Sequence, residues 1–453
     1  MTGNDALGRD LRAAVRGRVL TAADEGFARA ALGWSVGVPQ RPVAVVEVAD
    51  AADAAALVRH ANDAGLALAV QPSGHGATTA LDGAVIVRTG ALRDVTIDPD
   101  ARTATVGAGA SCGELLEAAG AHGLTFPAGS SPAVSVAGYT LGGGLGWYGR
   151  SRGPASASVR ALEIVDASGT ARRVTAAADP DLFWALCGGG GGDHALVTAL
   201  ELDLFPAPAL YGGRIIWPVD KAAEVLDAYA KTTAAAPEEL SVWVAIMQFP
   251  PFPELPEPLR GLSAVVVDAA HLGEAEEGRA LLAAFDAVDG VVFDTRGPLP
   301  PAALGSICAE PVEPMPSLHR GAFVTDLDGA SGVLRDLAAG GTVHPLVFVQ
   351  LRHLGGAYTR ELPGARGPVA EPYLLSMMGV TPGEETAAAV RERIGAVTGA
   401  MAPFTTGRKP YTFLCGGESA SDAFAPAVVE RLREVKRAHD PQGIFRSNFP
   451  ILD

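Results

Sequence analysis

The chain has 453 residues, of which 48% are apolar and 19% are charged, and its formal net charge is −16. This length is too great for one ordinary core, and the composition is typical of a compact globule rather than a disordered chain. The acidic balance argues against nucleic acid or an anionic membrane as a partner. No apolar stretch reaches the roughly 18 residues of a membrane span, and residues 1–5 show no basic region before an apolar core. We therefore expect no signal peptide and a cytoplasmic location.

The first part of the chain alternates short helices and strands. Residues 10–35 predict a helix, because alanine and arginine are spaced for one exposed face. Further elements are predicted as strands at 42–48, 66–70, 85–87 and 104–106 and as helices at 51–64 and 112–119. Such alternation places this part in the α+β or α/β classes.

A boundary is expected at Phe205-Pro206-Ala207-Pro208, where the pattern changes. Beyond it, strands of a larger sheet are predicted at 214–217, 241–247, 263–268 and 346–351, with helices at 221–234 and 274–285. An amphipathic helix is predicted at 425–439, and Asp440-Pro441 stops it.

The four cysteines, Cys112, Cys187, Cys308 and Cys415, are far apart and form no C-x-x-C pair. This spacing argues against a metal site of the zinc type and gives no disulfide framework. We expect buried free thiols in a reducing compartment.

Three glycine turns stand out. His75 lies in the first of them, 71–76, directly after a predicted strand, and the others are at 138–146 and 188–192. Glycine tolerates positive φ and lets a ligand approach the backbone N–H groups closely. Three such turns predict a large phosphate-bearing cofactor, and a histidine inside the first suggests a hold stronger than hydrogen bonds.

These motifs together resemble the berberine-bridge-enzyme-like oxidoreductases, within the vanillyl-alcohol-oxidase type of FAD-binding fold. The resemblance rests on Ser-Gly-His-Gly at 73–76, Ala-Gly-Ser-Ser-Pro at 128–132, the glycine run 142–146, residues 181–186, Asp440-Pro441, Phe445 and Asn448. It implies an α+β fold with a two-part FAD-binding domain and a substrate domain whose antiparallel sheet is covered by helices. The implied domains are 1–206 for FAD, 207–404 for substrate, and a C-terminal segment 405–453 that returns to the FAD-binding domain.

In that family, the histidine that matches His75 is bonded to the 8α-methyl carbon of the flavin. The chemistry needs a neutral imidazole beside the ring. Ser131 stands where many members carry a cysteine bonded to flavin C6, so the resemblance implies a single covalent bond, through His75.

The resemblance also implies the other FAD contacts. The turn 72–78 should offer backbone N–H groups to the pyrophosphate. The implied cofactor-binding residues are Ser73, Gly74, His75, Gly76, Ala77, Gly129, Ser130, Ser131, Val134, Gly138, Gly142, Gly143, Gly146, Gly192, Val197, Tyr411 and Asn448. The segment Gly192-Asp193-His194-Ala195 departs from the family's usual Gly-Asn-Phe-Gly.

Tyr411 is the nearest match to the tyrosine of the family's Tyr-x-Asn motif, which takes a proton as hydride leaves the substrate. A free tyrosine has a pKa of about 10, so a neighbouring charge would have to lower it. The third residue here is Phe413, and a register shifted by one places Pro410 at the tyrosine and Thr412 at the asparagine. Further candidates for the base are Tyr139, His353 and Tyr373.

The resulting expectation is an FAD-dependent oxidase of a small organic substrate: an alcohol, a sugar or a natural-product intermediate. Hydride passes to flavin N5 and molecular oxygen is the acceptor, with Val134 at the family's oxygen-access position. One alternative is a non-oxidative cyclase or isomerase that keeps FAD as a structural cofactor. Another is a binding protein that merely retains FAD.

Overall fold

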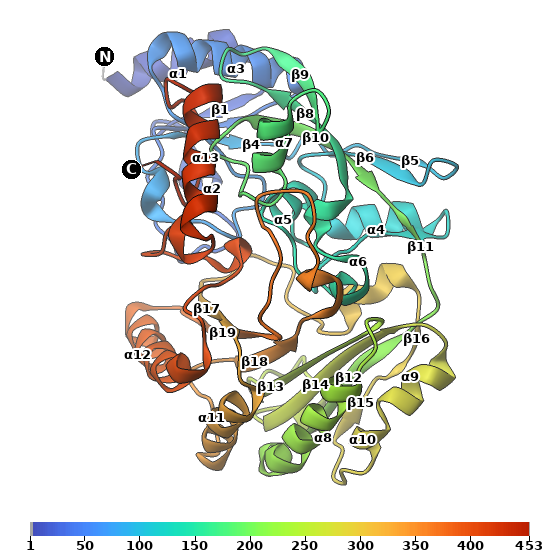
Figure 1. The fold of residues 1–453 in the computed structure, drawn as a ribbon. Coiled ribbons are helices and arrows are strands. Elements are labelled where there is room, and N and C mark those ends of the chain that lie inside the picture. The colour runs from blue at the N-terminus through green and yellow to red at the C-terminus, as the bar shows by residue number, and fades with distance from the viewer. Residues whose placement is uncertain (1–2, 453) are drawn as a thin grey trace.

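The computed structural model describes residues 3–452 and forms two lobes stacked one above the other (Figure 1). Met1 and Thr2, to which the signal-peptide expectation extends, lie outside that range. Within it, no helix combines the length and the apolar character needed to cross a bilayer.

The upper lobe begins with a four-stranded sheet. Its strands, in spatial order, are β1 (Arg18–Leu20), β2 (Ala44–Glu47), β4 (Val85–Arg88) and β3 (Leu68–Val70). The strand β4 pairs in parallel with both β2 and β3, as short strands joined by helical crossovers do. Helices α1 (Gly3–Ala14) and α3 (Ala51–Ala64) pack together, and both contribute apolar residues to this core.

The helix predicted over 10–35 is wrong. Helix α1 ends at Ala14, and Leu20 pairs with Val45 in the sheet. Gly26 has φ 86, which lies outside the helical region, and only a short helix, α2 (Phe27–Ala31), follows it. Burial of the 18–20 segment as an edge strand therefore outweighs the helical propensity of its neighbours.

The upper lobe also holds an antiparallel five-stranded sheet, which makes its architecture two-part. Its strands, in spatial order, are β5 (Val95–Asp98), β6 (Thr103–Gly107), β10 (Leu196–Asp203), β8 (Val159–Val165) and β9 (Ala171–Thr175). Residues of α4 (Cys112–Gly120), α5 (Val136–Leu141) and α7 (Pro180–Leu186) share one core with this sheet. A capping box of Ser111 and Glu114 fixes the start of α4.

The lower lobe is a large antiparallel sheet with helices on one face (Figure 1). Its main strands, in spatial order, are β15 (Phe293–Asp294), β12 (Leu210–Pro218), β14 (Ser263–Leu272), β13 (Leu240–Gln248), β18 (Phe348–His353), β19 (Tyr373–Val380) and β17 (Ser317–Val324), and β16 (Gly297–Leu299) pairs with β12. Helices α8 (Ala222–Ala235), α11 (Leu327–Ala339) and α12 (Glu384–Met401) cover the lower face. Helices α9 (Ala275–Leu281) and α10 (Ala283–Asp286) replace the single helix predicted at 274–285. The fold class expected from the sequence is confirmed.

Side chains on the opposite face of this sheet point toward the upper lobe. Trp243 of β13 stacks on Trp147 of the upper lobe, with ring centroids 3.7 Å apart. A segment of the lower lobe, residues 355–372, also reaches upward, and the amide of Ala365 at its tip donates to the carbonyl oxygens of Trp184 and Cys187. We call this segment the strap.

Residues 426–452 lie against the upper lobe, whereas Thr405 before them pairs with Val324 of the lower lobe. Helix α13 (Pro426–His439) packs beside α7, and Asp440 follows it. The next residues run parallel to β3, since Leu68 N donates to Ile444 O at 2.7 Å and Arg446 N donates to Leu68 O at 2.9 Å. The C-terminal segment is thereby brought to the first glycine turn, which follows β3.

Candidate functional site

The first glycine turn holds His75 in one orientation. The Ser73 hydroxyl lies 2.8 Å from His75 Nδ1, and the Trp34 ring stacks on the imidazole with centroids 4.5 Å apart. Gly74 has φ 79, and a Cβ there would lie 2.5 Å from the Cα of Gly33. The turn therefore needs glycine at this position, both for its backbone conformation and for close packing.

The other ring nitrogen of His75 has no partner. His75 Nε2 is buried and makes no hydrogen bond with any described residue. Burial, and to a lesser extent the neighbouring His319, lowers the pKa of His75 to about 4. The imidazole is therefore neutral at pH 7, which is the state that bonding to flavin requires. A buried, unpaired nitrogen is uncommon and costly in native proteins. These residues fit a bound FAD that would supply a contact to Nε2.

The C-terminal segment ties the far end of this turn. Thr78 N donates to Asn448 Oδ1 at 2.8 Å, and the Thr78 hydroxyl donates to the Asn448 carbonyl at the same distance. The Ala77 amide donates back to Gly74 O at 3.3 Å, and a Cβ at Gly76 would meet nothing within 4 Å. The turn is thus braced at both ends with open space at Gly76.

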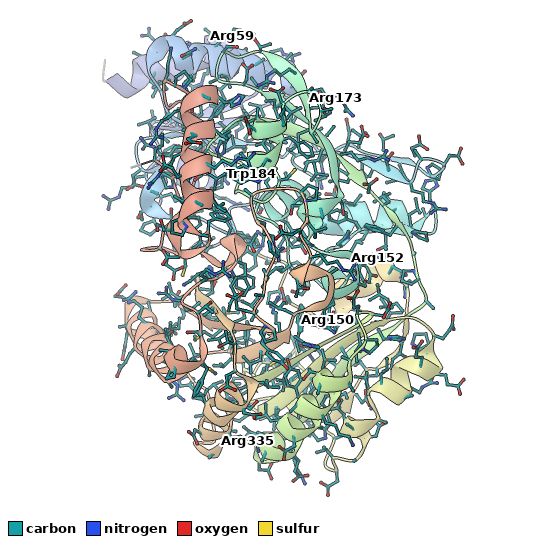
Figure 2. The ribbon with its side chains drawn as sticks, in the orientation of Figure 1. Arg59, Arg150, Arg152, Arg173, Trp184 and Arg335 are labelled. Atoms are coloured by element: carbon teal, nitrogen blue, oxygen red, sulfur yellow. The ribbon has the colours of Figure 1, made fainter. Side chains whose placement is uncertain are left out.

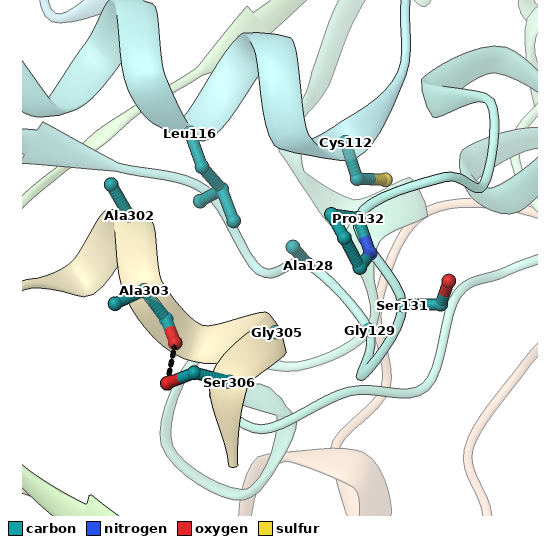
Figure 3. A pocket seen from close by; sticks show the side chains of 10 residues that line it. All are labelled: Cys112, Leu116, Ala128, Gly129, Ser131, Pro132, Ala302, Ala303, Gly305 and Ser306. Carbon is teal, nitrogen blue, oxygen red and sulfur yellow. Dashed lines mark hydrogen bonds between the residues drawn. The ribbon is translucent and has the colours of Figure 1, made fainter. Parts of the chain in front are cut away.

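The Ala-Gly-Ser-Ser-Pro motif at 128–132 lines a cavity of about 160 Å³ between the lobes (Figure 3). Cys112 and Leu116 of α4 face residues of the short helix η5 (Pro301–Ser306) across it, with Gly129 and Ser131 on the connecting loop. The Ser131 hydroxyl is buried and has no partner among the described residues. Ser130, its neighbour, is also buried, and Val134 is partly buried against the same core. The Ser131 position therefore presents a buried hydroxyl, not a thiol, to this cavity.

The second and third glycine turns receive side chains from elsewhere in the chain. A Cβ at Gly143 would lie 2.8 Å from Arg366 Cδ, and one at Gly190 would lie 2.3 Å from the Tyr411 ring. Gly142 faces Thr412 and Tyr411 in the same way, and the amide and carbonyl of Gly146 both bond the Tyr358 hydroxyl. Contact of these glycines with the cofactor stays a prediction, and the structure adds a second reason for their lack of side chains.

The remaining predicted cofactor residues occupy backbone positions near these turns. The Gly138 amide donates to Ser135 Oγ in the first turn of α5. Gly192 lies against Ser447, and Val197 is buried on β10 opposite Ile164.

Tyr411 is surrounded by the upper lobe and the C-terminal segment. Its ring packs on Phe424 and edge-on to Phe449, at centroid distances of 5.7 and 5.8 Å. Its hydroxyl lies near that of Ser447. Burial, followed by the charge of Asp193, raises the pKa of Tyr411, whereas the sequence argument required a charge that lowers it. Tyr411 is therefore a neutral phenol at pH 7.

Two residues behind Tyr411 were missed by sequence reasoning. Ser447 Oγ donates to Asp193 Oδ2 at 2.7 Å, and burial raises the pKa of Asp193 to about 6 although Ser447 and Lys436 favour its charged form. The only signal was the departure from Gly-Asn-Phe-Gly, which places an acid at position 193. The Tyr411 hydroxyl therefore lies near a serine that is hydrogen-bonded to a buried carboxyl group.

The other candidate bases lie in structural networks. The Tyr139 hydroxyl donates to Pro127 O at 3.1 Å, and burial raises its pKa well above the usual value. Burial, with the nearby charge of Arg150, lowers the pKa of His353 to about 3. The Tyr373 hydroxyl lies 3.2 Å from that of Thr233 on the helical side of the sheet. The described residues hold no group of three or more metal-ligating side chains.

Comparisons with known proteins match part of the chain to a cofactor-binding family. Residues 42–175 match the FAD binding domain family. The chain is 35% identical over 195 residues to FAD-linked oxidoreductase pytB of Aspergillus terreus, covering 42% of this chain and 24% of the relative. It is 31% identical over 206 residues to (R)-6-hydroxynicotine oxidase of Paenarthrobacter nicotinovorans, covering 45% of each. The match thus spans less than half of either relative.

The whole fold has solved counterparts. The structure of Physcomitrella patens BBE-like 1 superposes with a TM-score of 0.84 and 18% identity, covering 99% of both chains. At that identity the likeness concerns the fold alone. The resemblance to berberine-bridge-enzyme-like proteins, predicted from the glycine motifs, is confirmed at the level of the fold.

Proposed function

We propose that this chain, an FAD-linked oxidoreductase of berberine-bridge-enzyme-like fold, is an oxidase of a small organic substrate that holds its FAD covalently through His75. One observation carries the proposal: a neutral, buried, unpartnered imidazole nitrogen in the glycine turn of an FAD binding domain. The named oxidase among its relatives supports the class of reaction. Three buried free cysteines fit the proposed cytoplasmic location.

The residues of the first turn prepare His75 for its role. When Nδ1 carries the ring proton and donates it to the Ser73 hydroxyl, Nε2 presents its lone pair. The Trp34 ring fixes the plane of the imidazole. Ser131 does not supply a second bond, because a hydroxyl is a far weaker nucleophile than a thiolate at neutral pH.

Bound FAD supplies the redox chemistry, since its flavin accepts a hydride from the substrate. The chain supplies the proton path. In the proposed step the Tyr411 oxygen takes the substrate proton while its own proton passes to Ser447, whose proton passes to the carboxylate of Asp193. No tyrosinate forms, so the raised pKa of Tyr411 is no obstacle. With a pKa of about 6, Asp193 is mostly ionised at pH 7. Its pKa is close to the working pH, so it accepts a proton readily.

Molecular oxygen is proposed as the electron acceptor because Val134, three residues after Ser131, has a small side chain. A small residue at this position leaves room for oxygen beside the flavin. The substrate is proposed to be an alcohol, a sugar or a natural-product intermediate.

The test is an anaerobic screen of secondary alcohols, sugars and polyketide-like aromatic compounds, followed by bleaching of the flavin absorbance. An oxidase bleaches with its substrate, and admission of oxygen restores the colour and yields hydrogen peroxide. Product formation from a screened compound without bleaching would instead establish the non-oxidative cyclase or isomerase.

A further inference from the structure

An arginine in the strap has no acidic partner. Arg366 Nη2 is buried without a hydrogen bond, and Nη1 donates only to the carbonyl of the next residue, Gly367, at 3.0 Å. No ion pair of Arg366 exists among the described residues. Its stem is pressed between Gly143 and Gly188 of the upper lobe, and its guanidinium lies 5.3 Å from the centroid of the Tyr358 ring.

A second unpaired arginine projects from the sheet toward the same place. The Arg352 guanidinium lies 4.0 Å from the Trp243 ring centroid and 5.6 Å from that of Phe413. Its Nε donates to Gln350 Oε1 at 2.7 Å, which orients the planar fork. In the same row of side chains Arg214 has a carboxylate, that of Asp268, at 2.6 and 2.9 Å. Arg352 thus lacks the neutralising partner that this sheet provides to another arginine.

The two arginines border one apolar cluster. Arg366 lies over the Tyr358 ring and Arg352 over the Phe413 ring, and both rings pack in the cluster that also contains Leu145. Burial lowers the pKa of Arg366 to about 10, so it remains charged at pH 7. A buried charge without a counter-charge is expensive to maintain. The chain has a net charge of −16 and so has many carboxylates, yet these two cations at the lobe interface have no carboxylate partner among the described residues.

The surroundings limit what can neutralise them. The hollow beside Arg366 is lined by apolar side chains, among them Leu145, Phe323, Val369 and Phe424, by the Tyr411 ring and by two further basic residues. Arg408 and Lys409 at its rim already have carboxylate partners, Glu371 and Glu418. A carboxylate that reaches this hollow finds Arg366 available, with apolar side chains beside it.

We infer that Arg366 and Arg352 recognise a carboxylate on the substrate, so that the natural substrate is a small organic acid with an apolar or aromatic body. This inference rests on the proposed function, because it names the substrate class of the same site. Guanidinium forks match carboxylates in shape, and a charge-assisted hydrogen bond in such surroundings is worth a tenfold or greater difference in affinity.

The test compares benzoate with benzamide, its neutral counterpart of the same shape, by calorimetric titration of the purified holoprotein. We expect wild type to bind benzoate at least ~10-fold more tightly, and Arg366→Gln and Arg352→Gln each to remove most of that preference. Arg335→Gln is the matched control, since Arg335 pairs with Asp227 at the far end of the lower lobe (Figure 2). Should Arg366→Gln fail to fold, Arg352→Gln alone carries the comparison, because its side chain is partly exposed.

Equal affinities for benzoate and benzamide in wild type would overturn the inference, as would an unchanged preference in the folded variants. Reduced flavin is the other anion that could lie here, so the flavin midpoint potential is measured in the same proteins. A potential shifted by Arg366→Gln with the benzoate preference intact would assign the charges to the cofactor and overturn the inference. Wild type that contains no FAD would count against the proposed function, while the calorimetric comparison would still decide on carboxylate recognition.

Discussion

Replacement of Arg150 by methionine should lower the free energy of unfolding, because Arg150 joins the two lobes by hydrogen bonds. Arg150 belongs to the short helix α6 (Gly149–Arg152) of the upper lobe, and its buried side chain points into the lower one (Figure 2). Its Nε donates to Leu240 O at 2.8 Å, and Nη2 donates to Ala236 O and Pro237 O at 3.2 Å each. Its Nη1 bonds Leu354 O and lies 3.0 Å from His353 Nε2.

The expected loss follows from the acceptors left behind. Methionine fills much of the volume but offers no donor to the carbonyls just before and at the start of β13 or to the one just after β18. An orphaned buried acceptor costs about 1–3 kcal/mol, and water will reach some of these. We therefore take the low end of that range for each group and predict a loss of roughly 3–5 kcal/mol in the free energy of unfolding, as for removal of one partner from a buried charged network.

The assay is urea unfolding of holoproteins with matched FAD content, and Arg152→Met is the control. Arg152 lies two residues along the same helix (Figure 2), is exposed, and its guanidinium lies over the face of Phe205, 5.1 Å from the ring centroid. Its loss should cost about 0.5–1 kcal/mol. Equal losses for the two variants, or a loss below about 1 kcal/mol for Arg150→Met, would refute the assignment of Arg150 as the clamp between the lobes.

Three further predictions concern the site and its buried groups. Tyr411→Phe and Ser447→Ala should each slow anaerobic flavin reduction, the former by ~10²-fold or more, because each interrupts the proton path; stopped-flow rates equal to wild type would remove the path from the mechanism. Val134→Leu should slow reoxidation by oxygen more than reduction by substrate, and equal slowing would indicate a displaced cofactor instead. Burial lowers the pKa values of His194 and His353 to about 4 and about 3. Both histidines therefore leave the free energy of unfolding unreduced above pH 6.5 and lower it as the pH falls toward those values. Asp193, with its pKa raised to about 6, takes up a proton in the folded state below that pH and so stabilises the fold as the pH falls. Each histidine lowers the free energy of unfolding by up to ~1.4 kcal/mol per pH unit, and Asp193 offsets part of this loss. Urea unfolding should therefore show lower stability at pH 5 than at pH 7. Stability that is equal or higher at pH 5 would contradict this account.

Local signals were sufficient for many elements. Helix α3 runs from Ala51 to Ala64, as predicted, because Asp50 caps its start and Gly65 ends it in the left-handed region. The strands β17 and β19 were missed. Their faces toward the upper lobe carry His319 and Ser376, and these polar residues interrupt the apolar runs by which buried strands are recognised.

The site divides in the same way. His75 could be found from sequence, because one short turn contains the histidine, its glycines and Ser73. The partners of Tyr411 could not, since Asp193 and Ser447 lie 254 residues apart and meet only when the C-terminal segment folds back. The position of Arg366 could not be predicted either, because backbone hydrogen bonds hold the strap against the upper lobe and such bonds leave no sequence pattern.

The covalent bond to His75 is the central claim, and acid precipitation tests it most directly. The account predicts that wild-type protein keeps its yellow colour in the acid pellet and that, after proteolysis, the flavin is found on the peptide that contains His75. His75→Ala should bind FAD that acid releases, because the rest of the turn remains. Release of the flavin from wild type into the supernatant would contradict the claim.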